Sequence, residues 1–148
     1  MHPGQLLPHA PYIAAVDREL GARGIPPGRL WTYGAAYPGQ PPATTPAEQR
    51  LCALLEWDPS RCGPGMTWHW GVDTGWRCAR TGRGGRRLAS TTQTLWPPVY
   101  AAPAVLADVA QALIRGQRPV PCDQAGEWRG AAQVRDAVEK FRSAPPAH

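Results

Sequence analysis

Cysteine and histidine side chains come first among the residues that could do chemistry, because both ligate metals and both act in nucleophilic catalysis. The relevant residues are Cys52, Cys62, Cys78, Cys122, His2, His9 and His69. No two of the cysteines have the C-x-x-C spacing that is typical of zinc sites. His69 and Cys78 fall on opposite sides of a predicted hairpin, and nothing supplies a third group to orient a Cys–His pair. We expect reduced, partly buried cysteines and no cofactor, with a disulfide or a metal site as the alternatives.

The triplet Asp73-Thr74-Gly75 matches the core of the aspartic-protease motif. Because two carboxylates share one proton in that mechanism, a single copy would require a homodimer. Trp76 stands where those enzymes have a small residue, and the loosely matching segment 112–116 looks like the end of a helix instead of a strand. Gly75 also fits the last position of a three-residue hairpin loop, where φ is positive. We therefore interpret the triplet as a turn.

Five arginines in eleven residues form a charge cluster that no acidic residue interrupts. They are Arg77, Arg80, Arg83, Arg86 and Arg87. Arginines bind phosphates and nearby aromatic rings stack on bases, so this segment is the candidate contact for an anion or a nucleic acid. It is not a P-loop, because the glycines at 82–85 are not followed by the Lys-Ser/Thr pair. The alternative is a solvated loop, since fifteen arginines against one lysine are typical of a high-GC genome.

Among the elements that position these residues, the sequence predicts an aromatic hairpin most clearly. Apolar side chains alternate with small or polar ones on both sides of the turn: Trp68, Trp70, Val72, Trp76 and Cys78. A three-residue loop pairs Val72 with Trp76 and Trp70 with Cys78, which places all five side chains on one face. A two-residue loop would split the aromatic set, because a slip of one residue exchanges the two faces of a strand.

Three helices are predicted from apolar residues at helical spacing. The first covers 11–23, with a stripe of Tyr12, Ile13, Val16 and Leu20. The second covers 103–115, with a stripe of Val105, Leu106, Val109 and Leu113, and it begins at a proline. The third covers 126–142, with a stripe of Ala131, Val134, Val138 and Phe141.

The remaining strands are predicted at 30–33, 49–57 and 88–96, the last of them polar enough for an edge. Prolines interrupt 34–46, which we expect to be an exposed loop. The order is one helix, about four strands and two helices. This order predicts an α+β fold in which the helices pack on one face of an antiparallel sheet. We expect that covered face to be the tryptophan face.

Length and composition indicate a single domain over residues 1–148, with an ordered core at about 11–142 and frayed termini. The formal charge of +5 favours anionic partners weakly. No apolar run reaches the ~18 residues of a membrane span. The N-terminus lacks the basic start and apolar stretch of a signal peptide, so we expect a cytoplasmic protein.

Three segments together resemble a family of small uncharacterised proteins of high-GC Gram-positive bacteria, known as a domain of unknown function. They are PYIAAVDRELGARGIPPGRLW, LLEWD with WHWGVDTG, and VLADVAQALI. The resemblance covers roughly residues 11–115. It implies an N-terminal helix that ends in a Gly-Ile-Pro turn, then a tryptophan-bearing sheet and a closing helix. It implies no activity and no site residues.

No catalytic motif remains after these tests, so we expect a non-enzymatic protein-interaction or regulatory accessory module. Its partner would be a protein that the sequence does not identify. The alternative is a nucleic-acid-binding accessory protein that uses the basic segment from Arg77 to Arg87. A hydrolase is the third reading.

Overall fold

The computed structural model describes residues 7–35, 50–57, 65–81, 93–94, 99–115 and 126–143. Within these ranges the chain forms a helix, α1 (Ala10–Ala22), and four strands, β1 (Arg29–Ala35), β2 (Arg50–Trp57), β3 (Gly65–Gly71) and β4 (Gly75–Thr81). A two-residue strand β5 (Gln93–Thr94) and the helices α3 (Pro103–Ile114) and α4 (Ala131–Ser143) follow. The fold is the predicted α+β domain.

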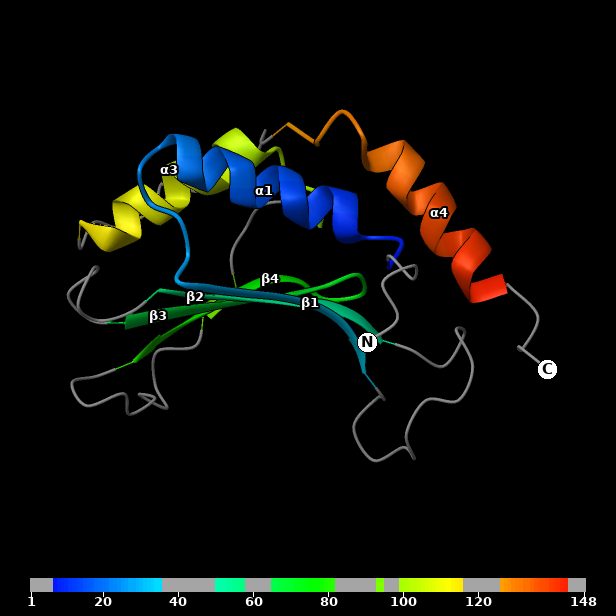
Figure 1. Ribbon diagram of the computed structural model, residues 1–148, viewed down its shortest axis with the longest axis horizontal. Helices are drawn as coiled ribbons and strands as arrows, with labels where there is room; N and C mark the ends of the chain where they lie inside the picture. The colour runs from blue at the N-terminus through cyan, green and yellow to red at the C-terminus, as the bar shows by residue number, and fades with distance from the viewer. Residues whose placement is uncertain are drawn as a thin grey trace.

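The strands form one sheet in the order β1-β2-β3-β4-β5, and all neighbours are antiparallel. All three helices lie on the same side of this sheet (Figure 1). α1 and α3 lie against each other, and the guanidinium of Arg23, directly after α1, contacts the Asp108 carboxylate on α3 at 2.7 Å. The sheet therefore has one face under helices and one face that no described helix covers.

Helix α1 begins and ends one residue earlier than predicted and has the predicted buried stripe. Tyr12, Ile13, Val16 and Leu20 are all fully buried. Gly24 ends the helix with a φ of 74°, and the Ile25 N–H donates to the Leu20 carbonyl at 3.0 Å. This is a Schellman-type end, for which glycine is the preferred residue.

The tryptophan face is the covered face, as predicted. Trp68, Trp70 and Trp76 are each at most 1 % exposed. Strand β2 adds Leu51, Ala53, Leu55 and Trp57 to the same core. Buried indoles need acceptors, and the Trp70 Nε1–H donates to the Val99 carbonyl at 2.7 Å. The aromatic residues of β3 and β4 thus form the core beneath the helices.

The hairpin register differs from the prediction by two residues. Trp70 pairs with Trp76, and Gly71 pairs with Gly75, whereas the prediction paired Val72 with Trp76. The Thr74 N–H donates to the Gly71 carbonyl at 3.2 Å, and Gly75 has the expected positive φ of 74°. Because side chains alternate with a period of two, a slip of two residues leaves every side chain on its predicted face.

Helix α4 begins five residues later than predicted, because the backbone groups of Gly126 and Trp128 form hydrogen bonds with the segment before α3. The Trp128 N–H donates to the Tyr100 carbonyl at 2.8 Å, and the Ala102 N–H donates to the Gly126 carbonyl at 2.9 Å. Glu127 forms a bridge with Ala101. These pairings hold residues 126–128 extended beside the start of α3.

Two predicted loops and one predicted strand fall largely outside the described residues. β1 extends to Ala35, so only residues 36–46 of the proline-rich loop remain, and they are not described. Of the predicted strand 88–96, the structure describes Gln93 and Thr94, which pair with β4 at the edge of the sheet. The basic loop after Thr81 and both termini are also outside.

Candidate interaction surface on the open face of the sheet

Side chains alternate between the two faces of each strand, and those that alternate with the core positions lie on the face that no described helix covers. We call this surface the open face. The register joins them in three cross-strand rows. One holds Trp31, Leu54, His69 and Arg77, the second Tyr33, Cys52 and Gly71, and the third Arg29, Glu56, Thr67 and Ala79. Arg50 follows the same alternation on β2, two positions from Cys52. The open face thus carries aromatic and basic side chains together with the carboxylate of Glu56, which lies opposite Arg29.

Trp31 is the outstanding feature of this face. Its side chain is 43 % exposed, and no other large hydrophobic side chain is exposed in the part of the chain that the structure describes. Leu54 lies opposite it in the neighbouring strand and is half-buried. Exposed tryptophan is enriched at protein contact surfaces, because a large ring gains much when it is desolvated.

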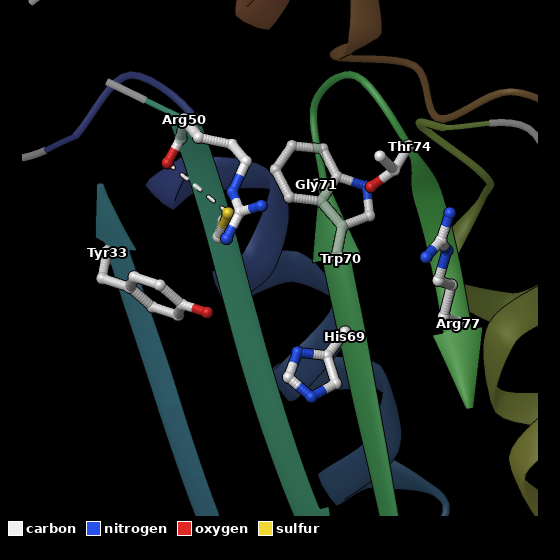
Figure 2. A pocket seen from close by; sticks show the side chains of 8 residues that line it. Tyr33, Arg50, His69, Trp70, Gly71, Thr74 and Arg77 are labelled. Carbon is white, nitrogen blue, oxygen red and sulfur yellow. Dashed lines mark hydrogen bonds between the residues drawn. The ribbon is translucent and has the colours of Figure 1, made fainter. Parts of the chain in front are cut away.

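A pocket of about 250 Å³ lies beside Trp31 on the same face (Figure 2). Its lining residues come from β1 to β4 and the turn between the last two: Tyr33, Arg50, Cys52, His69, Trp70, Gly71, Thr74 and Arg77. Gly71 continues the row of Tyr33 and Cys52 but has no side chain. The hollow therefore arises where a glycine interrupts a row of larger residues.

A larger residue at Gly71 would require the Thr74 side chain to move. A Cβ atom on Gly71 would lie 2.5 Å from the Thr74 hydroxyl oxygen, closer than real Cβ contacts. The glycine thus allows Thr74 to fold back over the end of β3 and to place its hydroxyl at the pocket. This close approach supplies a reason for glycine at position 71 that its sequence neighbourhood did not reveal.

The pocket is electropositive. Arg50 and Arg77 both line it, and neither forms an ion pair with any other described residue. The Arg50 Nε atom is buried and has no hydrogen-bond partner among the described residues. The nearby carboxylate of Asp73 accepts from Arg142 on α4 at 3.1 Å, and its charge also contributes to the raised pKa of Cys52 in the pocket. No carboxylate lines the pocket.

Cys52 does not have the environment of a catalytic nucleophile. Burial raises the pKa of its thiol, which keeps the sulfur protonated at neutral pH. The thiol donates to the Arg50 carbonyl at 3.4 Å (Figure 2). His9, the histidine that contacts this residue, bonds the Cys52 backbone carbonyl at 2.8 Å and not the sulfur. The bond from His9 to this residue is therefore not a base-to-nucleophile contact.

The other candidate chemistries find no support in their geometry. Asp73 and Thr74 form the hairpin turn, and Ala112 lies in helix α3, so the aspartic-protease elements are a turn and a helix. Cys78 is buried on the core face, and His69 lies on the open face. Within the described residues, no three His, Cys, Asp or Glu side chains are grouped to hold a metal ion. Cys62 and Cys122 lie outside those residues.

The five predicted contact arginines are described only in part. Arg77 is exposed on the open face and lines the pocket. Arg80 belongs to β4, where its backbone pairs with Met66. Its side chain, and all of Arg83, Arg86 and Arg87, lie outside the described residues. The nucleic-acid contact over these positions stays a prediction.

Tyr33, Arg50 and Thr74 line the pocket but were not predicted as site residues. A signal existed for Tyr33, because Trp31 and Tyr33 alternate with Leu30 and Thr32 in a predicted strand. No comparable signal existed for Arg50 and Thr74, since only the pairing of four strands brings them to one pocket.

No family model, no curated protein and no solved structure matches this chain. The resemblance to the domain of unknown function therefore remains an expectation. None of the described helices has the length and apolar character needed to cross a membrane.

Proposed function

We propose that this protein is a non-enzymatic, cytoplasmic interaction module that docks an acidic protein partner on its open face. The observation that carries the proposal is the division of the sheet into two faces. Three helices bury the tryptophans of β3 and β4, while Trp31 and the basic side chains of β2 and β4 are left on the other side.

The chemistry of the open face suits a protein surface with acidic residues. Trp31 and Leu54 offer apolar area, and Arg50 and Arg77 offer two positive charges without ion-pair partners among the described residues. A contact that combines an aromatic anchor with desolvated charges typically concentrates its binding energy in those few residues. Charge complementarity also steers encounter and selects against basic partners.

A photocrosslinking experiment tests this proposal. Benzoylphenylalanine replaces Trp31 in one variant and Gln133, an exposed residue of α4, in the matched control. In cells of the native host, position 31 should yield one discrete protein adduct that position 133 does not yield. Adducts of equal pattern at both positions, or none at position 31, would contradict docking on the open face.

Nucleic-acid binding is the second candidate, and one observation favours it. Trp31 and Tyr33 lie on the same face, two residues apart in one strand, which separates their Cα atoms by roughly 7 Å along the strand. Such a spacing suits the stacking of successive unpaired bases. Binding of this kind would weaken steeply with salt, by about 0.7 log units per log unit of salt for each phosphate contacted.

A labelled single strand distinguishes the two candidates. Wild-type protein, an Arg77→Glu variant and an Arg83→Glu variant are titrated against labelled DNA and RNA at low salt. The nucleic-acid candidate requires a shift that both substitutions weaken. Absence of any shift at micromolar protein removes that candidate and leaves the protein partner.

A further inference from the structure

The pocket next to Gly71 has features of a receptor for one anionic group. It is open to the uncovered face, it is larger than one carboxylate, and its volume of about 250 Å³ accommodates a short side chain. Four strands and one turn contribute to its lining. A site built on strands holds its groups more rigidly than a site built on a loop.

The charges in the pocket lack a counter-ion within the described protein. Arg50 and Arg77 lie on β2 and β4, with β3 between them, so they approach the hollow from two sides (Figure 2). The buried Arg50 Nε–H has no acceptor among the described residues. A buried donor without a partner is unfavourable, and an anion that accepts from it removes that cost.

Two neutral hydroxyl groups, of Tyr33 and Thr74, add to the hydrogen-bond donors of the pocket. Burial raises the pKa of Tyr33, so its hydroxyl keeps its proton at neutral pH. Tyr33, Arg50 and Arg77 line the hollow, and the Arg77 side chain extends along β4 toward Thr74 at the turn (Figure 2). Two guanidinium groups and two hydroxyls match an acceptor-only group and repel a cation.

We infer that this pocket binds a carboxylate that the protein partner presents. The inference rests on the proposed protein-docking function and adds the anchor of that contact. A carboxylate accepts from a guanidinium in a bidentate manner, and the remaining volume takes the aliphatic carbons that carry it. The carboxylate comes from an acidic side chain or from a chain terminus, because both present the same chemistry.

Small probes in an NMR titration test the inference directly. Uniformly labelled protein is titrated at low, constant ionic strength with N-acetylglutamic acid α-amide, which has only a side-chain carboxylate, and with N-acetylglycine, which has only a terminal one. The neutral N-acetylglutamine amide is the control ligand. At least one carboxylate probe should shift the amide signals of Gly71 and Thr74 saturably, with millimolar affinity, and the neutral control should not.

Three variants assign the effect to the pocket. Arg50→Gln and Arg77→Gln should each weaken the probe about tenfold or more, which is the range for a charge-assisted hydrogen bond. Arg18→Gln, an exposed arginine on α1, should change nothing. The indole signals of the buried tryptophans report whether each variant keeps its fold.

Two results would overturn the inference. One is the absence of localised shifts up to about 50 mM probe, where a site of millimolar affinity is nearly saturated. The other is inorganic phosphate that binds more than tenfold tighter than either carboxylate, which would assign the pocket to a phosphate group. Crosslinking at position 31 is independent of both, since Trp31 does not line the pocket, so the two proposals fail separately.

Discussion

The His9 imidazole stacks on the Trp70 indole with ring centroids 5.4 Å apart and planes 21° from parallel. His9 precedes α1 and is fully buried, although it is an ionisable residue. Its Nε2 atom bonds the Cys52 carbonyl at 2.8 Å, while Nδ1 has no partner among the described residues. The stack joins the N-terminal helix to the centre of the sheet.

Acid should destabilise the protein through His9. Burial lowers the pKa of this imidazole below its ordinary value of 6.5, so the folded state favours the neutral ring. The unfolded chain then binds the proton more readily. The contribution of His9 is complete above about pH 6.5 and is lost as pH falls toward the folded pKa, with a slope of up to about 1.4 kcal/mol per pH unit.

Urea unfolding from pH 7.5 to pH 5 measures this slope. The His9→Gln variant should show a flatter dependence than wild type. If His9→Gln and wild type lose stability in parallel, the imidazole does not carry the effect.

The protein should lose stability when Tyr12 loses its hydroxyl group but not when Tyr100 loses its own. The Tyr12 hydroxyl donates to the Ala101 carbonyl at 2.8 Å and accepts from the Trp76 indole at 3.2 Å. Tyr12→Phe leaves two buried polar groups without a partner and should cost about 1–3 kcal/mol. The buried Tyr100 hydroxyl has no partner among the described residues, so Tyr100→Phe should be neutral or stabilising.

Chemical denaturation gives the free energy of unfolding of both variants. The two rings contact each other with centroids 5.3 Å apart, so the two substitutions are made in the same part of the core. Equal losses of stability would show that the Tyr100 hydroxyl has a partner or that the Tyr12 bonds contribute little.

The two faces of the sheet should differ sharply in the cost of losing a tryptophan. Trp70→Ala removes a ring that is 1 % exposed and should lower the free energy of unfolding by about 3–5 kcal/mol. Trp31→Ala removes a ring that is 43 % exposed and should lower it by less than about 1 kcal/mol. A loss below 1 kcal/mol for Trp70→Ala in denaturant melts would show that the ring is not part of the core.

The core could be predicted from the sequence because periodicity alone determines which side chains share a face. Trp68, Trp70 and Trp76 were assigned to the buried face correctly even though the hairpin register was two residues off. A slip of two preserves the faces, so the apolar pattern contains no information that distinguishes the registers. In the observed register, the Thr74 N–H donates to the Gly71 carbonyl and closes the turn.

The pocket could not be predicted, because it depends on pairing between distant segments. Tyr33 and Cys52 meet only through the β1–β2 register, and Gly71 joins them through the β2–β3 register. The start of α4 was mispredicted for a related reason. Residues near Trp128 have helical sequence character, but their backbone groups pair with the segment before α3.

The affinity of the partner crosslinked at position 31 tests the central claim most directly. Isothermal titration compares the purified partner with wild-type protein, Trp31→Ala and the control Gln133→Ala at equal ionic strength. We predict that Trp31→Ala weakens binding about tenfold or more while its thermal stability stays near wild type, because an exposed aromatic anchor contributes to binding and not to the core. Gln133→Ala should bind like wild type. Equal affinities for all three proteins would contradict docking on the open face.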